Sequence, residues 1–170
     1  MPAVRCAMLL LILITGLLAP VGCGYTTREL YPADVRSVGV PIFANRSFYR
    51  GLERDVTEAL IKEIELRTPY KVARTASTDT ELTGTIVDVE QKLISRRRPG
   101  NLPQEIEVSV VVDWTWKNQR TGDVIRSRQG FESVGRYRPT QPIGDPFESA
   151  QHEAAQRLAT DIVSAMRADW

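Results

Sequence analysis

The sequence predicts an α/β domain of the α+β type: a two-layer sandwich in which one mixed, mostly antiparallel sheet carries two helices on one face. Residues 104–116 alternate between apolar and polar side chains, which is typical of a half-buried strand. Thr121-Gly122 lies between this strand and a second apolar run, which indicates a hairpin. Residues 51–67 and 145–170 each carry an apolar stripe at helical spacing. The order strand, helix, antiparallel strands, helix favours both helices on a single face.

The first strand is expected at residues 36–43. Pro41 cannot donate a ladder hydrogen bond, so this strand lies at a sheet edge or ends near the proline. The helix over residues 51–67 ends at Thr68-Pro69, because proline disfavours a helical conformation of the residue before it.

Three further strands complete the expected sheet. Residues 70–73 form a short strand, and residues 81–95 form a long one whose apolar positions change phase near Ile86-Val87. That change of phase predicts a bulge. Residues 124–134 return as the hairpin partner of the strand over residues 104–116.

The last helix begins with a recognisable cap. Asp145 is a good N-cap, Pro146 suits the first helical position, and Glu148 is placed for a capping box. The helix is expected to run nearly to Trp170.

Residues 1–22 have the pattern of a lipoprotein signal peptide. Arg5 precedes an uncharged run over residues 7–19, which is shorter than the roughly 20 apolar residues of a membrane-spanning helix. Small residues then lead to Cys23, which we expect to be the lipidated first residue of the mature chain. Pro20 stands three residues before the cysteine, where such signals usually carry leucine. An ordinary secretory signal and a short anchor helix therefore stay open as alternatives.

The expected organisation is a signal peptide over residues 1–22, a lipidated cysteine and tether over residues 23–34, and a domain over residues 35–170. Cys6 and Cys23 are the only cysteines, and Cys6 lies in the segment to be removed, so no internal disulfide is expected. Without Arg5, the chain has 21 basic and 21 acidic residues. This balance argues against nucleic-acid binding.

No catalytic or metal-binding constellation is visible. His152 is the only histidine, and with a single remaining cysteine it cannot supply the usual metal sites or a nucleophilic triad. We therefore expect no enzyme activity, no metal and no cofactor. An envelope enzyme that uses Glu105 and Glu107 is a weaker alternative, because these residues more simply form the wet side of a strand.

One basic cluster has chemistry of interest. Arg96, Arg97 and Arg98 lie where a strand runs into a loop, with Lys92 before them. Adjacent guanidinium groups can bind phosphates in a bidentate manner, and apolar residues beside them would suit the acyl chains of an amphiphile. A solvated hairpin loop is the alternative interpretation. Four further arginines could extend the basic surface, with the same alternative: Arg126, Arg128, Arg136 and Arg138.

Together these motifs resemble LptE, the lipoprotein family of lipopolysaccharide transport. The resemblance lies in Cys23-Gly24-Tyr25, in the segment VGVPIF with Asn45 before the first helix, in the basic hairpin turn before a valine-rich strand, and in the long C-terminal helix. It covers nearly all of residues 23–170.

The resemblance implies a protein anchored through Cys23 in the inner leaflet of the outer membrane, on the periplasmic side. Such proteins plug the large β-barrel protein LptD, help it to fold, and bind lipopolysaccharide. The resemblance implies lipopolysaccharide contact at Arg96, Arg97 and Arg98. The second basic contact of the family lies near the last helix, where this chain has no lysine, and Arg136 and Arg138 are the nearest substitutes.

A second class of assembly lipoprotein shares the opening VGVPIFAN followed by a helix. This pattern is similar to CsgG-like curli-secretion domains and to lipoprotein activators of peptidoglycan synthases. A CsgG-like protein would form an oligomeric secretion pore, but the chain has no second pair of long amphipathic strands for a membrane barrel.

Overall fold

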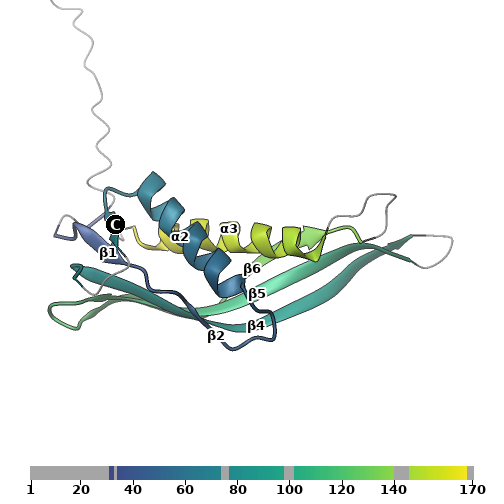
Figure 1. Ribbon diagram of the computed structural model, residues 1–170, viewed down its shortest axis with the longest axis horizontal. Coiled ribbons are helices and arrows are strands. Elements are labelled where there is room, and N and C mark those ends of the chain that lie inside the picture. The colour runs from purple at the N-terminus through teal and green to yellow at the C-terminus, as the bar shows by residue number, and fades with distance from the viewer. Residues whose placement is uncertain (1–30, 33, 74–76, 98–101, 140–145, 168–170) are drawn as a thin grey trace, which may run out of the picture.

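The computed structural model describes residues 31–32, 34–73, 77–97, 102–139 and 146–167 (Figure 1). Its elements in chain order are β1 (Ser37–Gly39), β2 (Ala44–Asn45), α2 (Leu52–Arg67), β3 (Lys71–Ala73), β4 (Thr80–Arg97), β5 (Leu102–Asn118), β6 (Val124–Tyr137) and α3 (Phe147–Ala165).

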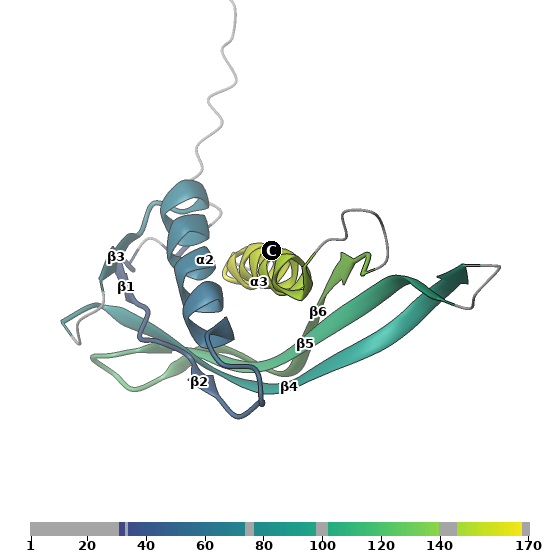
Figure 2. The same cartoon turned by 45° about the vertical axis from the view of Figure 1, so that its right-hand side comes forward.

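The strands form one six-stranded sheet in the order β3-β1-β4-β5-β6, with β2 paired to β4. β1 runs parallel to β3 and β4, and β2 runs parallel to β4, whereas β4, β5 and β6 are antiparallel. Both helices lie on the same side of this sheet (Figure 2). The predicted fold class, a mixed sheet with two helices on one face, is confirmed.

The core lies between the sheet and the helices, and β5 contributes most of its large side chains. Val108, Val110, Val112, Trp114 and Trp116 are all buried, as their alternation predicted. They meet the apolar stripe of α2 and a face of α3 in which three alanines allow close approach to the sheet. The fully buried residues of these faces are Val56, Leu60 and Ile64 of α2 and Ala150, Ala154, Ala155, Leu158, Ile162 and Val163 of α3.

The predicted first strand is shorter in the structure. β1 ends at Gly39, and the chain then leaves the ladder around Pro41 before it returns as β2. Between the two strands, the amide of Phe43 donates to the hydroxyl of Thr57 on α2 at 3.1 Å. The proline thus ends the strand as expected, but β1 lies between β3 and β4 and is not at the sheet edge.

The predicted bulge in β4 is confirmed by a register shift between Ile86 and Asp88. A further register shift, which no sequence pattern predicts, occurs where β6 has Gln129 and Gly130 opposite Asp113 of β5. Gly130 has φ of 62°, which glycine adopts without strain, and its amide donates to Oδ1 of Asp113 at 2.7 Å.

The ends of α3 differ from the prediction. The helix begins at Phe147, with Pro146 as the N-cap in place of the first helical residue, and it ends at Ala165. The predicted N-cap, Asp145, lies outside the described residues.

Candidate functional site

The hairpin of β4 and β5 extends beyond the helices and beyond β6 (Figures 1 and 2). We call residues 92–97 and 102–107 the arm. The pairing of β5 with β6 ends where Ile106 meets Tyr137, so among the described residues the outermost part of β5 pairs with β4 alone. A two-stranded projection of this kind exposes both of its faces.

The arm carries the predicted basic cluster at its outer end. Arg96 pairs with Pro103 and Arg97 with Leu102 in the last steps of the ladder. Arg98 lies outside the described residues, as do the side chains of Arg96 and Arg97. The backbone therefore places two of the three arginines near the tip, and the binding role of all three stays a prediction.

The other four arginines do not form one basic surface with this tip. Arg136 Nη2 forms an ion pair with Glu107 Oε2 at 3.2 Å, at the inner end of the arm. Arg126 and Arg128 lie opposite Trp116 and Trp114 in the ladder, at the other end of β6. Ten residues of extended strand separate Arg126 from Arg136, which corresponds to about 30 Å. Only Arg136 and its exposed neighbour Arg138 therefore lie toward the arm.

No sequence pattern predicts the contact between Arg136 and Glu107. The two residues are 29 positions apart in the sequence. They lie opposite each other only because the bulge at Gly130 shifts the register of β6 against β5. Glu107 is thus half of an ion pair. This finding weakens the alternative in which the Glu105 and Glu107 side of the strand performs catalysis.

The side of the sheet that faces away from the helices is polar, and we call it the outer face. Lys117 and Glu81 form an ion pair at 3.0 Å, Ser109 donates to Glu132 at 2.5 Å, and the Thr83 hydroxyl donates to the Thr115 carbonyl at 3.4 Å. Arg136 and Glu107 continue this row. The register places two half-buried valines, Val111 and Val134, on the same side. The polar residues of the outer face are Glu81, Thr83, Glu107, Ser109, Thr115, Lys117, Glu132 and Arg136, and they suit a hydrated or polar surrounding.

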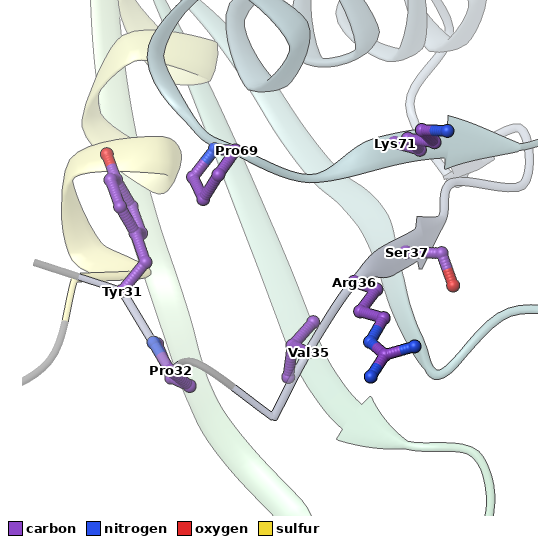
Figure 3. Close-up of a pocket in the computed structure, with 7 residues that line it drawn as sticks. All are labelled: Tyr31, Pro32, Val35, Arg36, Ser37, Pro69 and Lys71. Atoms are coloured by element: carbon purple, nitrogen blue, oxygen red, sulfur yellow. The ribbon is translucent and has the colours of Figure 1, made fainter. Parts of the chain in front are cut away.

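A hollow of about 570 Å³ lies where the chain enters the domain (Figure 3). Tyr31, Pro32, Val35 and Pro69 supply apolar surface, and the side chains of Arg36 and Lys71 point away from one another in Figure 3. The two cations therefore do not converge on a common point in the hollow.

The entering segment is fastened to the core by aromatic rings. The ring of Tyr31 meets that of Tyr70 edge-on at 5.7 Å, and Tyr70 in turn lies 6.1 Å from Trp116. Burial is the main cause that raises the pKa of Tyr70 well above its usual value. Tyr31 is therefore packed against the core of the domain.

Asp79 anchors the start of β1 from the other side. Its Oδ2 accepts hydrogen bonds from the amides of Arg36 and Ser37 at 3.0 and 3.1 Å and from the Ser37 hydroxyl at 3.1 Å. The hydrogen bond from the Arg36 amide is the largest cause that lowers the pKa of this carboxyl. The carboxylate thus acts as a structural acceptor.

The described residues contain no group of three or more histidine, cysteine, aspartate or glutamate side chains placed to hold a metal. His152 lies exposed on α3, with its Nε2 2.8 Å from Nε2 of Gln156. Within the same ranges, no helix has the length and apolar content needed to cross a membrane.

The structure is a small α+β domain with a polar sheet face and a projecting hairpin (Figure 1). The family model of LptE, described as lipopolysaccharide-assembly, matches residues 35–166. The chain belongs to the LptE family, as the sequence motifs predicted. This membership places it with assembly proteins and not with a family of enzymes.

Solved structures similar to this chain come from several bacteria, and the first two below share its fold. Protein XCC0632 from Xanthomonas campestris is 10% identical, with a TM-score of 0.55 over 80% of this chain and 88% of that one. The hypothetical protein CT253 from Chlamydia trachomatis is 12% identical, with a TM-score of 0.53 over 77% and 95%. Uncharacterized lipoprotein B from Nitrosomonas europaea is 16% identical, with a TM-score of 0.49 over 84% and 92%. Among curated protein sequences, none matches this chain.

Proposed function

We propose that this chain is an outer-membrane lipoprotein, attached through Cys23, that assists assembly of an LptD-type β-barrel and delivery of lipopolysaccharide to the cell surface. The match to the LptE lipopolysaccharide-assembly family over residues 35–166 carries this proposal. The role is structural: the domain fills part of the barrel lumen and holds the arm where lipopolysaccharide passes.

The outer face supports a place inside a barrel. The interior of a large membrane barrel is polar, whereas its lipid-facing side is apolar. The hydroxyls and ion pairs of the outer face can exchange their contacts with water for contacts with such a wall at little cost in desolvation. The opposite face of the sheet is already covered by α2 and α3 (Figure 2).

The arm supports contact with a phosphorylated glycolipid. Arg96, Arg97 and Arg98 lie in sequence at its outer end, where three guanidinium groups can bind phosphate oxygens. Reversal of all three to glutamate is expected to weaken lipopolysaccharide binding by about tenfold or more, because each charge-assisted hydrogen bond contributes roughly 1.5–3 kcal/mol.

A matched control reverses three exposed basic residues away from the arm: Arg54, Lys62 and Arg167. The two triple variants change net charge equally, so a loss specific to the arm separates local recognition from general electrostatics. Equal binding by the arm variant and the wild type would move the site elsewhere.

Attachment through Cys23 has its own test. Cys23→Ser removes the thiol that would carry diacylglycerol, so acyl labelling and sedimentation with membranes should both be lost. Continued labelling of the serine variant would contradict the anchor.

A further inference from the structure

The loop of residues 45–51, between β2 and α2, is fixed by its own side chains. Asn45 Nδ2 donates to the Tyr49 carbonyl and to Glu53 Oε2, both at 2.7 Å. Asn45 Oδ1 accepts from the amide and hydroxyl of Ser47 at 2.9 and 2.7 Å, and Glu53 Oε2 also accepts from the amide of Gly51 at 3.1 Å. The hydrogen bond from Asn45 is the largest cause that lowers the pKa of Glu53, so this acceptor is charged at neutral pH.

The same loop turns three residues outward. Arg46, Phe48 and Arg50 are exposed, whereas Ser47 and Tyr49 between them are half-buried. Phe48 is 101% exposed. Neither arginine has an ion-pair partner among the described residues. Single exposed hydrophobic residues are common, but this ring stands on a rigid loop between two unpaired cations.

The loop is fastened beside the inner end of the arm. The amide of Arg46 donates to the Ile86 carbonyl at the bulge of β4, at 2.9 Å. The hydroxyl of Tyr49 accepts from Gln91 Nε2 at 2.9 Å, and its ring lies 5.1 Å from that of Phe147 at the start of α3. The loop that carries Phe48 is therefore attached directly to β4 and to the start of α3.

The loop is also far from the place where the tether enters. Tyr31 and Tyr70 lie beyond the C-terminal end of α2, and the loop precedes its N-terminal end (Figures 1 and 2). A helix of 16 residues is about 24 Å long. If the proposed lipid at Cys23 holds the entry point near the membrane, the loop at the other end of α2 lies away from it, which favours a protein as the occupant of the loop.

We propose that the 45–51 loop docks on the β-barrel partner, with Phe48 in an apolar pocket and Arg46 and Arg50 paired with carboxylates at its rim. This inference rests on the proposed function. Aromatic and arginine side chains dominate the binding energy of protein interfaces, and a loop that is already ordered pays little conformational entropy on binding. The two unpaired cations favour a partner surface that carries carboxylates.

Photo-crosslinking of the full-length protein in cells tests the contact. p-Benzoylphenylalanine replaces Phe48, and a matched control carries the same group at Leu66, which is 78% exposed at the opposite end of α2. We expect ultraviolet light to join position 48, and not position 66, to the barrel protein, identified by mass spectrometry. Adducts from position 48 to lipid alone, to a second copy of this chain, or to nothing would overturn the inference.

Affinity of the detergent-solubilised complex gives a second readout. Phe48→Ala should reduce binding to the barrel about tenfold, as expected for an interface anchor, whereas Leu66→Ala should not. Because Phe48 is fully exposed, its variant should melt at the wild-type temperature. Unchanged binding by Phe48→Ala would refute this docking site and leave the proposed function intact. Failure of the wild type to bind any barrel would refute both.

Discussion

Gly135→Ala is expected to separate α3 from β6. A Cβ at Gly135 would lie 1.9 Å from the carbonyl oxygen of Ala150 and 2.8 Å from its carbonyl carbon. Both are backbone atoms of a helix, so they cannot rotate away as a side-chain end would. Since ordinary contacts begin near 3.4 Å, the helix would have to move by about 1.5 Å in a close-packed core.

The expected cost follows from this displacement. Overpacking of a core typically costs 1–3 kcal/mol, and a clash with backbone lies at the upper end of that range. We therefore expect Gly135→Ala to lower the free energy of unfolding by about 3 kcal/mol. For a domain of this size, the loss corresponds to roughly 10 °C in Tm.

Urea and thermal unfolding of the full chain, followed by circular dichroism, measure this loss. Gly122→Ala is the control, because its φ of 80° makes alanine strained while no atom lies within 4 Å of the added Cβ. The control should lose about 1 kcal/mol from backbone strain alone. If Gly135→Ala loses no more than the control, α3 does not approach β6 as closely as described.

Three smaller predictions follow from single contacts. The hydrogen bond from the Arg36 amide is the chief cause that lowers the pKa of Asp79, so this carboxylate stabilises the fold above pH 3.8 and the stabilisation is lost as the pH falls. The urea midpoints of the wild type and Asp79→Ala should therefore converge in acid, and a constant difference between them would contradict this role. Burial raises the pKa of Tyr70, so above pH 10.0 this tyrosine ionises more readily in the unfolded chain than in the folded one, and the folded protein loses stability as the pH rises. Between neutral pH and about pH 11, Tyr70→Phe should therefore lose less stability than the wild type does, and an equal loss would contradict the burial of this hydroxyl. Ser133→Ala removes a buried hydrogen bond to the Ala154 carbonyl, 3.1 Å long, and should cost about 1 kcal/mol in urea unfolding; no loss would contradict that contact.

The sequence predicted those parts of the fold that local patterns encode. The alternation in β5 and the helical stripe of α2 each reflect burial on one face, which leaves a period in the chain. The turn at Thr121-Gly122 and the helix stop at Thr68 reflect local backbone chemistry, and both were predicted.

Features that depend on distant partners could not be predicted in this way. The amide of Phe43, between β1 and β2, donates to the hydroxyl of Thr57 on α2, a contact no local pattern reveals. The ion pair of Arg136 with Glu107 depends on a bulge in the intervening strand. The loop that carries Phe48 is held by hydrogen bonds of Asn45 with the Tyr49 carbonyl and with Glu53, and the sequence does not reveal these partners.

The family match decides between the two sequence resemblances in favour of LptE. What the domain offers to its surroundings is a polar face, a basic arm tip and a fixed aromatic loop. Each is suited to contact with another molecule, which agrees with an assembly role.

Purification of the native protein from detergent-solubilised outer membranes, followed by mass measurement of the intact complex, tests the central claim most directly. The account predicts an equimolar complex with an LptD-type β-barrel. A ring made only of copies of this chain, as a CsgG-like protein would form, would contradict it.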